Sequence, residues 1–315
     1  MADHHFADRL TQAIADKGTA ACVGIDPVLS RLPEVIRCRC ESEGSANAQA
    51  TVDALVDFGR RIIQVVAPLV PAVKINSAFF EQYHWPGIRG YDDLVSHAKT
   101  SGLIVIGDVK RADIGHSSAA YAAAHLGDGP FEDLPGLQTP DAVTVNAYFG
   151  GDGVQPFVEQ AKRRGKGVFA LVQTSNESAR QVQGLTLEGG LPLGEQMALL
   201  VSGWANDRDL IGQSGFSCLG AVVSPSGLEP TTRLRNLMPR CLFLVPGFGA
   251  QGRTVEQVRA CFKPDGTGAL VNASRSVIYA YQEPKYKQRG ADAWERSVEL
   301  ACRDFVEALK PMTSA

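Results

Sequence analysis

The sequence predicts an α/β fold of the (β/α)8 barrel class, a TIM barrel, and three observations support this prediction. Eight short apolar runs recur along the 315 residues, segments with helical periodicity lie between them, and polar residues end the runs where one face of a barrel would gather them. Residues 1–315 contain no repeat, low-complexity tract or linker, so we expect a single domain. An open doubly wound sheet is the alternative, although such sheets usually have five or six strands.

The eight apolar runs have the composition of strands. Each is rich in β-branched and apolar residues and ends in Gly, Pro, Asn, Ser or a charged residue. Because the runs lack strict polar–apolar alternation, we expect strands that are buried on both faces, as parallel strands are. The runs span residues 19–26, 71–76, 103–110, 141–146, 167–175, 219–225, 241–247 and 269–274.

Segments with apolar residues at helical spacing lie between the strands. Gly165 follows Arg163 and Arg164, so it is expected to end a helix whose last turn carries cationic side chains. Residues 36–50 and 181–195 are longer than ordinary connections between strands and helices. Long loops at the C-terminal rim of a barrel are typical of lids and substrate-binding loops. For residues 36–50, an insertion without function is an equal alternative. The helical segments are residues 51–70, 91–100, 155–165, 193–207 and 254–262.

Composition argues against several classes of protein. A net charge of −3, a pI near 6.1 and the lack of a long Lys/Arg run give no support to nucleic-acid binding. The N-terminus lacks a signal-peptide pattern, and no apolar run approaches the roughly 18 residues of a membrane span, so we expect a cytoplasmic protein without membrane contact. The seven cysteines form no CxxC pair, which favours reduced thiols over a zinc site.

Polar and charged residues end several predicted strands. The C-terminal strand ends of a barrel form its active-site face, so these residues are the candidates for function. They are Asp26, Lys74, Asn76, Asp108, Lys110, Asn146, Ser175, Ser224 and Arg275, together with the turn at residues 246–252.

Three of these charges can form an alternating lattice. Asp108 and Lys110 are two residues apart, so both side chains would leave the same face of their strand. Such a pair alone is more often a salt-bridged strand end than a catalytic pair. Lys74, on the adjacent strand, would add a second cation, and alternating charges can share a dry pocket because each offsets the desolvation of the next. The lattice would hold Lys110 protonated and fixed in place, and a positioned ammonium group is a proton donor.

Asp113 lies three residues beyond Lys110, past the end of the strand. It can cap the helix that "IGHSSAAYAAAH" predicts, and it can also be a functional carboxylate. His116 and His125 are better explained as helix-surface or packing residues than as bases.

The last two strands indicate an anion site. The Gly-rich turn "PGFGAQG" follows the seventh strand, and Arg275 follows the eighth. Phosphate sites in these barrels are built from these two loops, with backbone N–H groups and a helix N-terminus facing the anion. Glycines allow close approach, and Gln251 and Arg275 can add donors. We therefore predict phosphate binding at Gly249, Gln251, Gly252 and Arg275.

No metal or organic cofactor is predicted. The second strand supplies Lys74 where a divalent-ion enzyme would need another oxygen ligand. No GxGxxG follows the first strand, and Pro27 stands where a dinucleotide-binding helix would begin.

The chain resembles the orotidine 5'-monophosphate decarboxylase family. "DVKRADI" (residues 108–114) matches the family's Asp-x-Lys-x-x-Asp motif, and "PGFGAQG" and "NASRS" match its phosphate segments. "VGIDP", "VKIN", "TVNAYFG" and "QTSNESA" follow in the family's order. The resemblance covers about residues 6–305, and the long first loop and "SRS" are similar to the second bacterial subtype.

The resemblance implies cofactor-independent decarboxylation of orotidine 5'-monophosphate to uridine 5'-monophosphate (UMP), the last step of de novo UMP biosynthesis. Lys110 would protonate the ring carbon that loses carbon dioxide. Asp108 would lie against the departing carboxylate, and Lys74 would bind the ribose and orient Asp108.

The resemblance also implies binding roles. Asp26 would bind a ribose hydroxyl, Ser175 the pyrimidine, and Gln251 and Arg275 the phosphate. Asp113, with Ile114, would be supplied across the interface of a homodimer to the partner's pocket, which explains why it lies beyond its own strand.

Two residues depart from the family's pattern, and two rival functions remain. Arg253 stands where the family commonly has Gly, and Glu177 where Pro is usual, so both bear on loop closure. One rival is a related magnesium-dependent decarboxylase of a sugar-acid phosphate with the same Asp-x-Lys frame, against which Lys74 argues. The other is a non-catalytic phosphometabolite-binding barrel, against which the intact charged residues argue.

Overall fold

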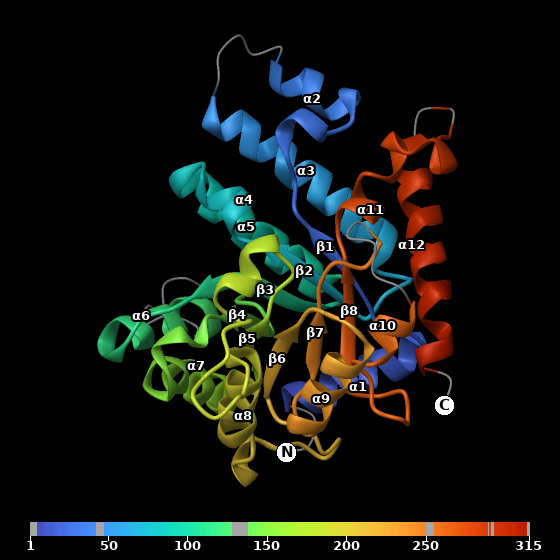
Figure 1. The fold of residues 1–315 in the computed structure, drawn as a ribbon. Helices are drawn as coiled ribbons and strands as arrows, with labels where there is room; N and C mark the ends of the chain where they lie inside the picture. The colour runs from blue at the N-terminus through green and yellow to red at the C-terminus, as the bar shows by residue number, and fades with distance from the viewer. Residues whose placement is uncertain are drawn as a thin grey trace.

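Eight parallel strands close into a barrel in the computed structural model (Figure 1). The structure describes residues 5–41, 47–127, 138–249, 255–288, 290 and 293–313. Each strand pairs with its neighbours in sequence, and β8 pairs with β1. The predicted TIM barrel is confirmed, and the doubly wound sheet is excluded. The strands are β1 (Ala21–Ile25), β2 (Ala72–Asn76), β3 (Ile104–Arg111), β4 (Ala142–Val145), β5 (Gly167–Gln173), β6 (Leu219–Val223), β7 (Phe243–Val245) and β8 (Ala269–Ala273).

Every predicted apolar run corresponds to one of these strands, and only β3 extends past its run, by one residue to Arg111. Most strands are shorter than the run, and Pro27, Pro225 and Pro246 stand within two residues after β1, β6 and β7. Strands β1, β4, β6, β7 and β8 are buried along their whole length. The expectation of strands covered on both faces is therefore confirmed for these five.

Helices surround the barrel, and the five predicted helical segments correspond to α3, α5, α7, α8 and α10. Gly165 ends α7 with a left-handed φ of 63°, as its position after two arginines predicts. The helix expected after Asp113 is α6, and helices α1, α2, α4, α9, α11 and α12 were not predicted. The helices are α1 (Phe6–Lys17), α2 (Glu34–Glu41), α3 (Ala48–Val66), α4 (Ala78–Glu81), α5 (His84–Thr100), α6 (Gly115–Leu126), α7 (Gly151–Arg164), α8 (Leu193–Ala205), α9 (Leu228–Leu237), α10 (Val255–Arg259), α11 (Arg275–Ile278) and α12 (Ala293–Thr313).

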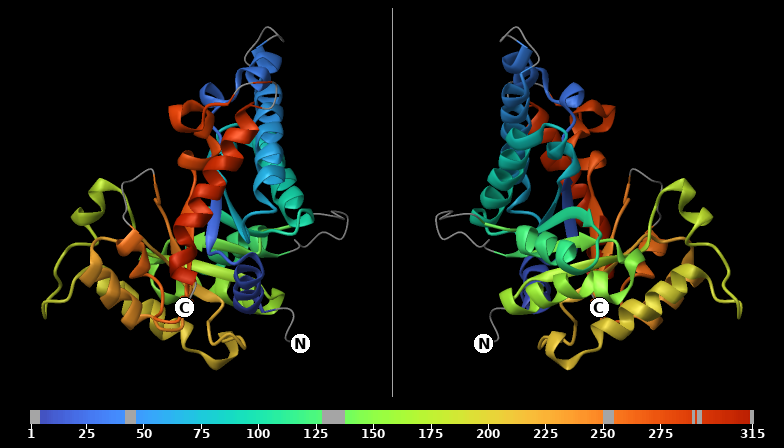
Figure 2. Two further views of the ribbon diagram at one scale, coloured as in Figure 1. Left: turned by 90° about the vertical axis from the view of Figure 1, so that its right-hand side faces the viewer. Right: turned by 90° about the vertical axis from the view of Figure 1, so that its left-hand side faces the viewer.

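The long loop expected at residues 36–50 is wrong in its described part. Helix α2 continues to Glu41, and α3 begins at Ala48 after Asn47, whose side-chain oxygen accepts a hydrogen bond from the Gln49 N–H at 2.9 Å. This helix pair extends beyond one side of the barrel (Figures 1 and 2). The second long segment, residues 181–195, is mostly turns before α8, as expected.

The first and last helices of the described chain both pack on the barrel (Figure 2). The Phe6 ring of α1 meets the Phe169 ring edge-to-face, with the centroids 5.9 Å apart. Arg9 donates a hydrogen bond to Asp141, directly before β4, so α1 covers the N-terminal ends of β4 and β5. Helix α12 contacts β1 and lies beside α3.

Within the described residues, none of the helices is both long enough and apolar enough to cross a membrane.

Candidate active site

Four charged side chains of alternating sign form a continuous chain at the C-terminal ends of β1, β2 and β3. Lys74 Nζ lies 3.6 Å from Asp26 Oδ1 and donates a hydrogen bond to Asp108 Oδ2 at 2.8 Å. Lys110 Nζ donates to the other Asp108 oxygen, Oδ1, at 2.5 Å. The lattice expected from the sequence is therefore present, and Asp108 lies at its centre between two ammonium groups.

The inner part of this chain is dry, and its outer end reaches solvent. Lys74 and Asp108 are 6% and 7% exposed, whereas the side chain of Lys110 is 49% exposed. Burial alone would lower the pKa of Lys74, but Asp26 and Asp108 more than offset it and hold that pKa above its usual value. Burial likewise would raise the pKa of Asp108, yet the two lysines hold it well below its ordinary range. Lys74 and Asp108 are thus both charged near neutral pH.

The backbone at Lys110 departs from a regular strand. Gly107 pairs with Val143 and Arg111 with Val145, so residues 108–110 stand opposite Thr144 alone. Lys110 has a left-handed φ of 43°, a conformation that costs a residue with a side chain about 1–2 kcal/mol. Asp108 and Lys110 do meet, as strand alternation predicted, but they meet through this bulge.

Thr144 fills the gap opposite the bulge. Its hydroxyl donates to Asp108 Oδ1 at 2.9 Å and accepts the Lys110 backbone N–H at 3.0 Å. Thr144 was not among the predicted site residues, although a signal existed: it is a polar residue inside an apolar run, two residues before the predicted binding residue Asn146.

Arg111 ties the end of β3 to the surrounding helices. Its guanidinium donates to the Val109 carbonyl at 3.1 Å, to the Glu81 carboxylate on α4 and to His125 Nε2 on α6 at 3.2 Å. Burial, and secondarily the charge of Arg111, lowers the pKa of His125 to about 4, so its ring is neutral and can accept this bond. His125 is a packing residue here, in agreement with its predicted role.

The charged chain opens into a cavity of about 160 Å³. Ser175, one of the predicted binding residues, lines it together with two polar residues that were missed, Thr174 and Asn272. Asn272 is 4% exposed and donates to Ser274 Oγ at 3.2 Å, while its Oδ1 has no hydrogen-bond partner among the described residues. The opposite wall is apolar and consists of Leu171, Val222, Leu244 and Pro246. A polar ligand could thus meet ions on one side and an apolar wall on the other.

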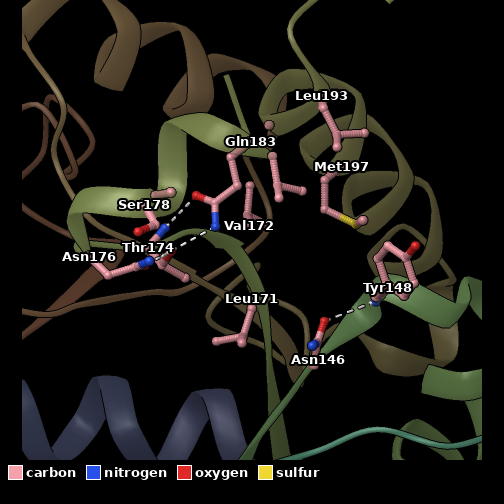
Figure 3. Close-up of a pocket in the computed structure, with 13 residues that line it drawn as sticks. Asn146, Tyr148, Leu171, Val172, Thr174, Asn176, Ser178, Gln183, Leu193 and Met197 are labelled. Carbon is pink, nitrogen blue, oxygen red and sulfur yellow. Dashed lines mark hydrogen bonds between the residues drawn. The ribbon is translucent and has the colours of Figure 1, made fainter. Parts of the chain in front are cut away.

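A second cavity, of about 250 Å³, adjoins the first and shares Leu171 and Thr174 with it (Figure 3). Asn146 and Tyr148 line one side, and the opposite side carries Gln183, whose amide group is paired with Thr174. The Gln183 oxygen accepts the Thr174 N–H at 2.9 Å, and its nitrogen donates to the Thr174 hydroxyl at 2.7 Å. This pairing fixes the segment directly before Ser175.

Two predicted binding residues hold local turns. Asn76 Oδ1 accepts the Ala78 N–H at 3.2 Å, and Asn146 Oδ1 accepts the Tyr148 N–H at 3.1 Å. Neither lines the charged cavity, and Asn146 lines the adjoining one. The side-chain amides of both residues therefore shape the rim in this structure.

Asp113 does not cap helix α6. The N-cap residue is Ile114, and Asp113 Oδ1 accepts the Ile114 N–H at 2.8 Å, so the predicted capping role is wrong. Ile114 itself is 53% exposed, and Tyr148 and Phe149, in the short helical turn after β4, are 76% and 51% exposed. Three large apolar residues are thus exposed in the single chain, and one of them, Tyr148, lines the second cavity.

The predicted phosphate residues are only partly described. Gln251 and Gly252, like Arg253, lie outside the described residues. Gly249 has a left-handed φ of 78°, and a Cβ built on it would lie 3.0 Å from Ser276 Oγ, so the turn after β7 touches the start of α11. Arg275 is the first residue of α11 and is exposed. The two loops therefore meet as a phosphate site would require.

Among the described residues, no group of three or more His, Cys, Asp or Glu side chains is arranged to hold a metal ion. Six cysteines of the described chain are free thiols, and all of these but Cys38 are buried.

Comparison with known proteins gives one consistent family. Residues 47–289 match the model of the orotidine 5'-phosphate decarboxylase / HUMPS family. Orotidine 5'-phosphate decarboxylases from Rhodopirellula baltica and Caldicellulosiruptor saccharolyticus are 38% and 36% identical to the chain, over 97% and 98% of it and 99% of each relative. The solved structure of OMP decarboxylase from Leishmania donovani superposes with a TM-score of 0.71 at 26% identity, and the match covers 99% of both chains.

Proposed function

The chain belongs to the orotidine 5'-phosphate decarboxylase / HUMPS family, and from that premise we propose that it converts orotidine 5'-monophosphate to UMP without a cofactor. The relatives that it matches over nearly their full length are carboxy-lyases. The observation that carries the proposal is the continuous chain of Asp26, Lys74, Asp108 and Lys110 beside a small cavity.

In the proposed reaction, Lys110 is the proton donor. The bond between the ring carbon and the carboxylate breaks, carbon dioxide leaves, and the electron pair stays on the ring carbon. A proton from Lys110 Nζ then forms the new C–H bond. The half-exposed side chain of Lys110 supports this role, because water can return the proton to the amine between turnovers.

The other three charges prepare Lys110 for this step. Asp108, which is buried between two lysines, keeps the Lys110 ammonium close to the reacting carbon and lies where the departing carboxylate would be. Lys74 holds Asp108 in place and, with Asp26, would bind the ribose hydroxyls. The field around the carbanion is therefore built before the substrate arrives and needs no rearrangement during the reaction.

The phosphate would bind far from the reacting carbon. Gly249, Gln251, Gly252 and Arg275 remain our candidates, supported by the contact between the turn after β7 and the start of α11. Such remote contacts can offset the cost of orienting and desolvating the reacting end of the substrate. Asn76, Asn146 and Ser175 remain the candidates for contacts to the rest of the nucleotide.

We further propose that two copies of the chain assemble into a homodimer in which Asp113 and Ile114 reach the partner's cavity. The exposed Ile114, Tyr148 and Phe149 support this assembly, since burial against a second copy would remove them from water. Residues 1–315 would act as one domain, which the packing of α1 and α12 on the same barrel supports. The buried free thiols are consistent with a reducing, cytoplasmic location.

An absorbance assay with orotidine 5'-monophosphate, with and without a chelator, tests the proposed function. We expect turnover that the chelator does not change, and a loss of about 100- to 10,000-fold in kcat for Lys110→Ala. Lys285→Ala is the matched control, because this lysine is 69% exposed and contacts Asp304 and Tyr286 at the surface.

Two results would contradict the proposal. Turnover that requires magnesium, or a sugar-acid phosphate as the only substrate accepted, would favour the rival decarboxylase of the same family. Robust turnover by Lys110→Ala would remove Lys110 as the proton donor while leaving the overall reaction intact.

A further inference from the structure

We infer that Thr144 is a positioning residue that sets both Lys110 and Asp108 for the proposed decarboxylation, so this inference rests on the proposed function. Thr144 is 1% exposed and lies near the end of β4, opposite the bulge of β3. Its single hydroxyl serves the two residues at once, because it donates to Asp108 and accepts from the backbone of Lys110.

The hydroxyl fixes the Lys110 backbone in an otherwise unfavourable conformation. A left-handed φ of 43° persists at a lysine only where surrounding contacts over-determine it. Thr144 Oγ1 holds the Lys110 N–H at 3.0 Å, and the Val109 carbonyl is held by Arg111 at 3.1 Å. The peptide group between Val109 and Lys110 is therefore tethered at both of its polar atoms, and Thr144 supplies the tether on the cavity side.

The same hydroxyl orients the carboxylate that Lys110 binds. Asp108 Oδ1 receives the Thr144 hydroxyl at 2.9 Å and the Lys110 ammonium at 2.5 Å, while Lys74 takes the other oxygen. Thr144 thus fixes the position of Lys110 twice, once through the Lys110 backbone and once through its ion-pair partner. A hydroxyl with one donor and two acceptor sites is the smallest side-chain group that can do both.

The inference is tested with Thr144→Val, which keeps the shape of the side chain and removes the hydroxyl, and with Thr144→Ser, which keeps the hydroxyl. For Thr144→Val we expect kcat to fall by about 10- to 100-fold while KM changes by less than about threefold, because the reacting end is misplaced and the remote contacts are intact. Thr144→Ser should recover kcat to within about threefold of the wild type.

Thr19→Val is the matched control. Thr19 is fully buried at the opposite end of the barrel, and its hydroxyl also accepts a backbone N–H, that of Ala21 at 3.3 Å. The Thr19→Val substitution should lower the melting temperature about as much as Thr144→Val does, and it should leave kcat unchanged. A kcat for Thr144→Val within about threefold of wild type, or a Thr144→Ser variant as slow as Thr144→Val, would overturn the inference.

A crystal structure of Thr144→Val separates this inference from the proposed reaction. We expect the φ of Lys110 to become negative in this variant. We also expect the distance between Lys110 Nζ and Asp108 Oδ1 to exceed about 4 Å, which is too long for an ion pair. If Lys110 keeps its backbone conformation and its contact with Asp108 in the Thr144→Val structure, the inference is overturned, even if the wild type decarboxylates orotidine 5'-monophosphate. A wild type that does not turn over orotidine 5'-monophosphate would overturn the proposed function, while the structural comparison would still decide the role of Thr144.

Discussion

At the scale of single residues, the cavity depends on Lys74, Asp108 and Lys110 and on the Thr144 hydroxyl, which supports two of them. Lys74, Asp108 and Lys110 are visible in the sequence because each interrupts an apolar run near its end, where a barrel gathers side chains. The bulge opposite Thr144 is set by the register between β3 and β4, which is a tertiary property. Asn272 Oδ1 has no hydrogen-bond partner within the described chain, and this too is a result of tertiary packing. The roles of Thr144 and Asn272 could therefore not be assigned from local sequence pattern alone.

The buried pair of Lys74 and Asp108 gives a prediction about stability. Lys74→Met keeps the volume of the side chain but leaves Asp108 buried with only one cation, so we expect the free energy of unfolding to fall by about 3–5 kcal/mol. Urea denaturation followed by circular dichroism measures this change. Lys285→Met removes an exposed ion pair and should cost less than about 1 kcal/mol. Equal losses in the two variants would contradict the account.

At the scale of elements, the order of strands followed from the sequence, whereas several helices did not. Helix α2 is short and carries arginine and cysteine residues without a wide apolar face, so its sequence does not predict a helix. Helix α9 contains a proline and two threonines and has few apolar residues. Helix α12 spans 21 residues and follows the eighth strand, where the alternation of strand and helix requires a helix, so it could have been predicted from the pattern. Strand signals are local and repeated, while a helix that packs on only one side of a barrel gives a weaker pattern.

The cluster that joins β3, α4 and α6 predicts a dependence of stability on pH. His125 is neutral in the fold because its pKa is lowered to about 4, so the unfolded chain binds more protons between about pH 6.5 and 4. The contribution of neutral His125 to the free energy of unfolding is fully present above about pH 6.5. It is lost as the pH falls toward 4, by at most about 1.4 kcal/mol per pH unit.

His125→Gln isolates this contribution, since glutamine can accept the Arg111 hydrogen bond and does not titrate. We expect the difference in unfolding free energy between variant and wild type to shift in favour of the variant as the pH falls from about 6.5 to about 4. Other groups that titrate here, such as Asp92, whose pKa burial raises to about 6, cancel in this difference. A difference that stays constant with pH would show that His125 is not held neutral.

The close packing of α1 on β5 predicts the effect of adding a methyl group at Gly167. A Cβ at Gly167 would lie 2.2 Å from the Phe6 ring, so Gly167→Ala forces α1 away from β5 and should cost about 1–3 kcal/mol. Gly203 lies in the exposed part of α8, where a Cβ would point into open space, and Gly203→Ala should stabilise by about 0.5–1 kcal/mol. Thermal unfolding measures both, and the same sign in both variants would contradict the packing argument.

At the scale of the whole molecule, the proposed dimer gives the sharpest prediction. If Asp113 acts in the partner's cavity, then Lys110→Ala and Asp113→Ala damage different residues of each composite site. Homodimers of either variant have two damaged sites and should be nearly inactive. A mixed dimer holds both changes in one site and an intact set of residues in the other. Random mixing makes about half of the dimers mixed, so the mixture should recover about a quarter of the wild-type activity.

The measurement is decarboxylation after the two variants are unfolded together, refolded and compared with each variant treated alone. Lys110→Ala mixed with Asp108→Asn is the control, because both changes lie in the same chain's contribution to the cavity and no intact site can form. Recovery in the first mixture and not in the second would locate Asp113 across the interface. No recovery in either mixture would place Asp113 in its own chain's cavity, and the solvent-facing Ile114, Tyr148 and Phe149 would then need another explanation.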